Sequence, residues 1–332
     1  MLEPSRIMRL ASAFQESCLL FAASDLGVFG KLAELGEADG GQLAAALRLN
    51  ERGTGLLLNA CAAIGLLEKN GARFRNSPEA AAFLVPGQRG DLSGALRYNR
   101  DVYNAWGKLT QLARTGSPVE DPQLHLGDDP VRTRDFVLSM HGKAMAMAQP
   151  VLSLLDLRGR KRLLDVGGGP GTFSVLIAKA NPEIQCTVLE LPPITAIAKD
   201  LIAAQGEAER VTLLPGDYHT TPFPAGNDVV LLFGMMHQEP VETIRDLLAR
   251  AYAALAPGGM VYVMDMMTDE SHTRPPFSAM FAVNMALTKE HGWVFSDVEL
   301  QAWMSEAGFE STTVRPLPPP MPHWMASAKK PQ

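Results

Sequence analysis

The chain has 332 residues, 46% of them hydrophobic and 20% charged, which is typical of a soluble protein with a sizeable core. The formal net charge of −6 disfavours a protein that holds nucleic-acid phosphates. Only three cysteines occur, far apart, so we expect no disulfide framework and no metal site, and we expect a cytoplasmic protein. No apolar stretch approaches the ~20 residues of a membrane helix, and we expect no signal peptide.

Residues 1–85 are predicted to form a mainly helical domain. Apolar residues recur at helical spacing near the N-terminus, and Asn50 is placed to cap a helix over residues 51–67. The next segment predicts a β-hairpin that turns at Asn70 and Gly71. Helices followed by a hairpin are typical of a winged helix. Because basic and acidic residues nearly balance, a dimerising role is favoured over DNA binding.

Residues 86–160 are predicted to connect two domains. Helical spacing extends over residues 131–155, after an earlier helical stretch and a proline-containing loop. This helix carries Phe136 and Met140, which we expect to line one wall of a substrate pocket. Met285, from a later segment, is assigned to the same pocket.

Residues 161–332 alternate strand and helix, as in an α/β domain. The strands are nearly all apolar, as expected when helices cover both faces of a parallel sheet. The predicted strands are residues 162–167, 186–191, 211–216, 228–234 and 260–266. The predicted helices are residues 173–180, 194–206, 241–255 and 297–308, and a short final strand is expected at 323–329.

A glycine-rich loop follows the first of these strands. The strand ends at Asp165, and Gly167, Gly169 and Gly171 then precede a helix. Glycines permit a tight turn, and the absence of a Cβ lets a ligand approach the backbone closely. Such a loop by itself is weak evidence, because dinucleotide-binding enzymes carry similar loops. The residues around it are needed to distinguish the two kinds of site.

Two further acids stand at the ends of the next strands. Glu190 ends the second strand, where a carboxylate can accept both ribose hydroxyls. Asp217 ends the third strand, placed to accept a hydrogen bond from an adenine amino group, with Tyr218 along the base. A single strand-end acid is about as often a helix cap, but three in succession favour a nucleoside site.

Several segments together carry a family resemblance. They are LLDVGGGPG, VLELPP, RVTLLPGDY, the strand that leads to His237, and ALAPGGMVYVMD. With these motifs the chain resembles the plant caffeate-type and acetylserotonin-type small-molecule O-methyltransferases and their bacterial relatives, which tailor polyketides and pigments. The N-terminal SCLLFAASDLGVFGKLAE is similar to the dimerising winged-helix domain of that family. The motifs are specific for the cofactor and the architecture, and not for the acceptor.

The resemblance implies a Rossmann-like methyltransferase domain of seven strands that binds S-adenosylmethionine, in a homodimer that acts on a small molecule. Gly167 and Gly169 would contact the methionine portion of the cofactor. Glu190, where the family more often has Asp, would bind the ribose, and Asp217 with Tyr218 the adenine. The other residues assigned to the cofactor site are Asp165, Gly171, Leu191 and Phe233.

A histidine base is expected just past the fourth strand. Methyl transfer requires that acceptor oxygen, methyl group and sulfur lie in line and that the acceptor lose a proton, which suits a neutral histidine. The family has this base where the chain has His237, in the turn before Pro240, a residue suited to a helix start. Asp265, at the end of the fifth strand, is expected to orient the ring. Phe233 replaces a lysine that is common in the family.

The chain departs from the family around this histidine. Gln238 and Glu239 stand where an acid and a tryptophan are usual, and Val294 replaces a second acid, for which Glu290 or Asp297 could substitute. A phenolic acceptor, being acidic, would need only a weak base. Because these residues beside His237 differ from the family, an alternative function stays open. It is an enzyme of the same fold that methylates carbon or nitrogen or carries out non-methylating tailoring chemistry. A winged-helix regulator that senses a nucleoside is a further alternative.

Overall fold

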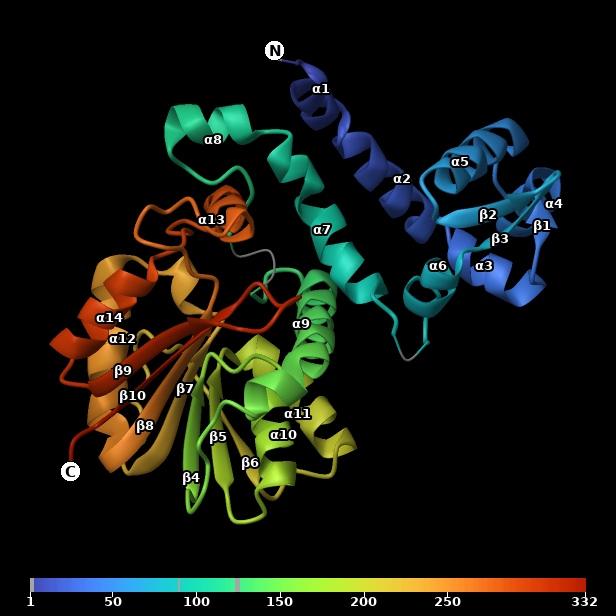
Figure 1. Cartoon of the computed structure of the whole chain (residues 1–332). Coiled ribbons are helices and arrows are strands. Elements are labelled where there is room, and N and C mark those ends of the chain that lie inside the picture. Colours follow the sequence, from blue (N-terminus) through green and yellow to red (C-terminus); the bar gives the residue numbers. More distant parts are fainter. Residues whose placement is uncertain (1–2, 89, 123–125) are drawn as a thin grey trace. The chain divides into compact units, whose positions relative to one another are not determined.

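The structure, a computed structural model, describes residues 3–88, 90–122 and 126–332 (Figure 1). Its contacts divide the chain into two compact units, Met1–Asp101 and Val102–Gln332. Within the described ranges, no helix is both long enough and apolar enough to cross a membrane.

The first unit combines short helices with a three-stranded antiparallel sheet in the order β1-β3-β2. Its strands are β1 (Ala38–Asp39), β2 (Leu67–Asn70) and β3 (Arg73–Asn76). Its helices are α1 (Ser5–Ser12), α2 (Phe14–Asp25), α3 (Val28–Leu35), α4 (Gly40–Leu47), α5 (Glu51–Ala63) and α6 (Pro78–Phe83). The core between them contains large apolar side chains, among them Phe29, Leu32, Leu43, Leu58 and Phe74.

Two local predictions in this unit are confirmed, whereas the position of one turn and one helix boundary are wrong. The side chain of Asn50 caps α5 by accepting a hydrogen bond from the Gly53 N–H at 2.9 Å. The predicted β2–β3 hairpin forms, with its turn at Gly71 and Ala72, one residue later than predicted, and Gly71 has a left-handed φ of +60°. Helix α5 ends at Ala63 instead of residue 67, because Gly65 adopts a φ of +81°, which a helix does not allow.

The second unit is built on a seven-stranded sheet in the order β6-β5-β4-β7-β8-β10-β9. Neighbours from β6 to β8 are parallel, and β10 runs antiparallel to both β8 and β9. The strands are β4 (Arg162–Val166), β5 (Gln185–Glu190), β6 (Val211–Pro215), β7 (Asn227–Phe233), β8 (Leu255–Asp265), β9 (Glu310–Pro316) and β10 (Trp324–Lys329). The five predicted parallel strands and the final strand are confirmed.

Helices cover both faces of this sheet (Figure 1). Apolar side chains of α9, α10 and α11 pack on one face, and those of α12 and α14 pack on the other. These helices are α9 (Pro130–Leu152), α10 (Thr172–Ala180), α11 (Pro192–Ala204), α12 (Val241–Ala254) and α14 (Asp297–Glu306). The remaining helices are α7 (Ser93–Trp106), which spans the unit boundary, α8 (Leu109–Thr115), the 3-10 turn η1 (Met236–Gln238) and α13 (Pro276–Thr288). Helix α13 lies outside the predicted helices.

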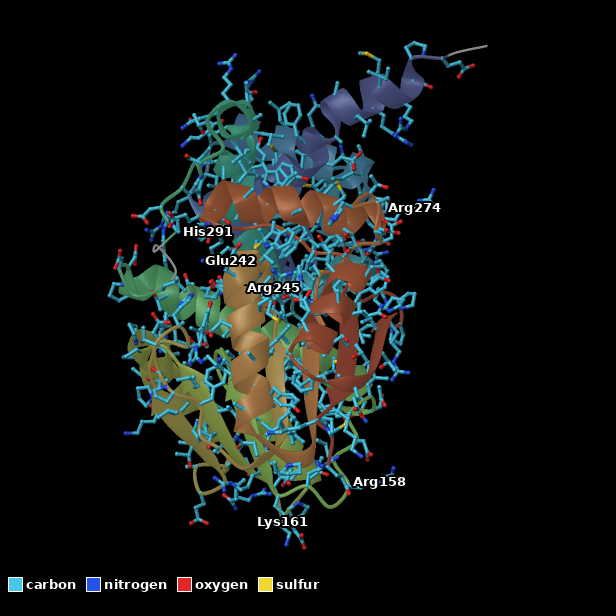
Figure 2. All side chains as sticks on the ribbon, turned by 90° about the vertical axis from the view of Figure 1, so that its left-hand side faces the viewer. Arg158, Lys161, Glu242, Arg245, Arg274 and His291 are labelled. Carbon is cyan, nitrogen blue, oxygen red and sulfur yellow. The ribbon has the colours of Figure 1, made fainter. Side chains whose placement is uncertain are left out.

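Helix α12 illustrates how the pattern of the sequence fixes a helix to the sheet. Ile244, Leu247 and Leu248 are fully buried, whereas Glu242 and Arg245 point outward from the same helix (Figure 2). This anchorage holds η1, which immediately precedes α12, at the carboxyl edge of the parallel strands. That edge is where ligands bind in open α/β sheets.

Candidate active site

The loop after β4 is shaped by glycines in the left-handed region. Gly167, Gly169 and Gly171 have φ values of +64°, +55° and +70°, which strain any residue with a side chain. The Gly167 N–H donates to the Leu189 carbonyl at 2.8 Å, which ties the loop to β5. A Cβ on Gly169 would meet no atom within 4 Å, so this part of the loop faces open space. The loop therefore forms a backbone cradle open to a ligand.

Glu190 completes that cradle at the end of β5. Its two carboxylate oxygens accept one backbone N–H each, from Gly169 and from Leu191, both at 2.8 Å. The side chain is buried, and burial raises the pKa of its carboxyl group. Each carboxylate oxygen has two acceptor positions, so one on each remains for a ligand hydroxyl. The residues present fit a ribose with two vicinal hydroxyl groups.

Asp165 lies beneath the loop. Its carboxylate is almost fully buried and accepts a hydrogen bond from the Ser174 hydroxyl at 2.7 Å. Burial, together with the charge of Glu190, raises the pKa of Asp165 to about 6 despite that bond. A Cβ on Gly168 would stand 2.6 Å from the Asp165 Cγ, so the sequence needs glycine there as well. The structure thus places Asp165 as a support of the loop.

The loop after β6 brings Asp217 and Tyr218 toward the glycine loop. A ring carbon of Tyr218 lies 3.8 Å from the place where a Cβ on Gly167 would stand. The Asp217 side chain is 46% exposed, and one of its oxygens, Oδ1, accepts hydrogen bonds from the backbone and ring of His219. The other oxygen, Oδ2, makes no hydrogen bond within the described residues and is placed to accept one from a ligand.

His237 and Asp265 meet as the resemblance implies. The ring Nδ1 lies 2.6 Å from Asp265 Oδ1, and the His237 backbone N–H donates to Asp265 Oδ2 at 3.2 Å. Asp265 is 1% exposed and the His237 side chain 14% exposed. A carboxylate at Nδ1 selects the tautomer that carries its proton there, which leaves the Nε2 lone pair free to accept a proton. The Phe281 ring packs edge to face on His237, with centroids 5.1 Å apart.

A tryptophan that the sequence analysis does not single out secures the turn around His237. The Trp293 backbone N–H donates to the His237 carbonyl at 2.9 Å, and its indole N–H donates to the Glu239 carbonyl at 2.7 Å. Glu290 and Asp297 make no hydrogen bond to His237 in the described part of the chain. The segment in which Val294 replaces an acid thus contributes to the site through Trp293.

The residues predicted to line the acceptor pocket come from two helices. Phe136 and Met140 lie half-buried on α9, and Met285 is buried on α13, one helical turn after Phe281. Phe233 is buried in the core, where its ring packs edge to face on Phe173 with centroids 5.3 Å apart. Phe233 therefore packs against the start of α10, and its assignment to the cofactor site stays a prediction.

Three further histidines lie in or beside the site. His141 Nδ1 hydrogen-bonds to Thr172 Oγ1 at 2.7 Å, at the start of α10. His219 bonds to Asp217. His323 precedes β10, whose register pairs Trp324 with Asp265, and its Nδ1 is buried without a partner among the described residues. Burial lowers the pKa of His323 to about 4, although the charge of Asp265 acts against this.

The sequence matches two family models. A model described as the O-methyltransferase domain matches residues 123–310, and one described as the O-methyltransferase dimerisation domain matches residues 8–86. The first match spans more than half of the chain. The chain therefore belongs to the O-methyltransferase family and is an S-adenosylmethionine-dependent O-methyltransferase, which confirms the predicted family, fold class and cofactor.

Individual relatives and a solved structure are similar to this chain over nearly its whole length. Over 94% of this chain and 91% of the relative, the sequence is 32% identical to a 3-hydroxy-5-methyl-1-naphthoate 3-O-methyltransferase from Streptomyces sahachiroi. It is 30% identical to the N,N-dimethyltransferase OxyT from Streptomyces rimosus, over 98% and 96% of the two chains. Among solved structures, human N-acetylserotonin methyltransferase in complex with S-adenosylmethionine matches with a TM-score of 0.89 and 25% identity, over 100% of this chain and 99% of that one.

Proposed function

We propose that this enzyme methylates a phenolic oxygen of a small aromatic secondary metabolite, with His237 as the general base. The observation that carries the proposal is the 2.6 Å contact between His237 Nδ1 and the buried Asp265 carboxylate, at the sheet edge that also holds the glycine loop. The relative from Streptomyces sahachiroi, named for methylating an oxygen of a hydroxynaphthoate, supports a phenolic acceptor.

The cofactor is assigned to the cradle of glycines and acids. Glu190 accepts the ribose hydroxyls, because both of its oxygens are held by backbone N–H groups. Gly167 and Gly169 let the methionine portion approach the backbone, and Asp217 Oδ2 accepts from the adenine amino group. When bound, S-adenosylmethionine supplies a methyl group activated by a sulfonium.

The base removes the acceptor proton. Asp265 holds the Nδ1 proton, so Nε2 of His237 would take the proton of the phenol, whose oxygen would bond to the methyl carbon as the methyl–sulfur bond breaks and S-adenosylhomocysteine leaves. The buried carboxylate then stabilises the imidazolium that forms. Aromatic and sulfur-containing side chains of α9 and α13 hold the acceptor ring; they are Phe136, Met140, Phe281 and Met285.

A panel of acceptors tests this assignment. The enzyme is incubated with methyl-labelled S-adenosylmethionine and phenols, catechols, quinols and aromatic amines, and both label transfer and S-adenosylhomocysteine are measured. Label on a phenolic oxygen is expected. Label only on nitrogen would favour the second candidate, amine methylation, which is suggested by the name of the relative from Streptomyces rimosus. Bound cofactor with no methylated product from any acceptor would contradict both.

The quaternary organisation is also proposed. Residues 1–85 would form the dimerisation domain, 86–160 a connector that lines the pocket, and 161–332 the cofactor-binding domain. Helix α1 exposes Ile7 by 68% and Leu10 by 60%, an apolar surface that a second copy would cover. Light scattering should show a homodimer that Leu10→Asp dissociates, and a monomeric wild type would contradict the proposal. A cytoplasmic location stays a prediction.

A further inference from the structure

A continuous chain of hydrogen bonds joins the adenine side of the site to the turn that carries the base. Asp217 Oδ1 lies 2.7 Å from His219 Nδ1, and His219 Nε2 lies 3.0 Å from Glu239 Oε2. The other carboxylate oxygen of Glu239 accepts the Tyr218 hydroxyl. His219 therefore stands between two carboxylates and is the only side chain of the described residues that bonds to both. Glu239 follows directly on η1.

Both ends of this chain are fixed by further contacts. Arg250 of α12 donates to the backbone carbonyls of Tyr218 and Thr221, each at 2.6 Å, which holds the loop after β6. Trp293 donates to the Glu239 carbonyl, and Gln238 donates to the Tyr218 hydroxyl at 3.2 Å. These contacts hold the backbone of the loop after β6 and of Glu239, so the His219 bonds join two segments whose backbone is fixed.

The charges around His219 favour its protonated form. Burial alone would lower the pKa of His219, but its bonds to Glu239 and Asp217 and the charges of these carboxylates outweigh burial, and the pKa is raised. The pKa of Asp217 is lowered, because the bonds from His219 outweigh partial burial. Among the described residues, the other charged or titratable groups that face His219, Asp217 and Glu239 are Tyr218, Arg250, Lys289 and Glu190. The charges of Lys289 and Glu239 act on each other, and the charge of Asp217 acts on the Glu190 carboxyl.

We propose that His219 is a positioning residue that couples cofactor binding to the base. By donating to both carboxylates, it turns Asp217 so that Oδ2 faces the adenine amino group, and it fixes Glu239 and with it the η1 turn that holds His237. The inference rests on the proposed role of Asp217 in the cofactor site. A neutral imidazole has a single N–H donor and can serve only one of the two carboxylates.

The test compares two substitutions at this position by calorimetric titration with S-adenosylhomocysteine. His219→Phe keeps an aromatic ring beside Tyr218 but donates to neither acid, and its affinity should fall by about tenfold, as for the loss of a charge-assisted hydrogen bond. His219→Arg can donate to both acids at every pH, and the 44% exposure of the side chain leaves room for it, so affinity should stay near that of the wild type. His291→Phe, at an exposed histidine on the surface (Figure 2), is the matched control.

The pH profile of binding separates positioning from mere structural support. Wild-type affinity should decrease as pH rises through the raised pKa of His219, and this decrease should be absent from both variants. A decrease that persists in His219→Phe would overturn the proposal and assign the titration to Lys289, whose pKa burial lowers. Equal affinities of the wild type and His219→Phe would also overturn it. Because no acceptor is present, a failure of the phenol assignment would not alter these results.

Discussion

The two sides of the active site are constructed in different ways. On the glycine-loop side, the backbone conformation of the loop shapes the site, and Glu190 is held by two backbone N–H groups. On the base side, Asp265 and Phe281 contact His237 with their side chains and Trp293 with its backbone N–H, from three separate segments. Consecutive residues determine the first side and long-range packing the second, so substitutions should affect cofactor affinity and turnover separately.

The largest expected effect is a loss of turnover without a loss of cofactor affinity. His237→Ala removes the base, and general base catalysis typically supplies ~10²–10⁴-fold in rate. The kcat should therefore decrease by a factor in that range, while the dissociation constant of S-adenosylhomocysteine stays nearly unchanged, because His237 contacts no part of the glycine loop in the described contacts. Steady-state kinetics and calorimetry on the same preparation measure both. Full turnover at neutral pH would leave the histidine without a catalytic role.

The opposite separation is expected from Gly169→Ala. A side chain in the left-handed region costs about 1–2 kcal/mol of fold stability. The added Cβ would also stand where the loop is open to the cofactor, so affinity for S-adenosylhomocysteine should decrease by about tenfold or more. Gly206→Ala is the matched control, because Gly206 has a φ of +76° and similarly open surroundings at the end of α11. Equal loss of affinity in both variants would mean that strain, and not contact with the cofactor, explains the result.

A smaller effect, on turnover alone, is expected from Trp293→Phe. The change removes the indole bond to the Glu239 carbonyl, and a bond of about 1 kcal/mol corresponds to about fivefold in kcat if the turn loosens accordingly. Trp303→Phe is the control, since the Trp303 ring packs beside the Trp293 ring, with ring centroids 6.2 Å apart. If the two variants have the same kcat, the indole bond does not position the base.

The smallest effect concerns stability and the support beneath the glycine loop. Asp165 has an ordinary pKa of 3.8 when unfolded and about 6 when folded, so its ionisation destabilises the fold as pH rises from about 4 to about 6. Asp165→Asn cannot ionise, yet its side chain keeps an oxygen that accepts from Ser174. The melting temperature of the variant minus that of the wild type should therefore increase over this pH range. A difference in melting temperature that stays constant with pH would contradict the raised pKa of the buried Asp165 carboxyl.

The sequence predicts the glycine-loop side of the site better than the base side. The strands β4 to β8, the three glycines and the acids Glu190 and Asp217 were predictable, because each depends on a few consecutive residues. Asp265 beside His237 followed from the family resemblance. Trp293 and His323 were not predictable, since the antiparallel pairing of β8 with β10 and the return of the segment after α13 bring distant residues together. Helix α13 escaped prediction because apolar residues occupy most of its positions and leave no single stripe.

The central claim is that Nε2 of His237 takes the proton of the acceptor. The most direct test is how the rate loss in His237→Ala depends on the acidity of the acceptor. The ratio of wild-type kcat to that of His237→Ala is measured at neutral pH over a series of substituted phenols of increasing acidity. The ratio should fall steadily along the series, because the more acidic phenols ionise unaided and no longer need a base. A ratio that stays the same across the series would show that His237 only positions the acceptor, and would contradict the mechanism.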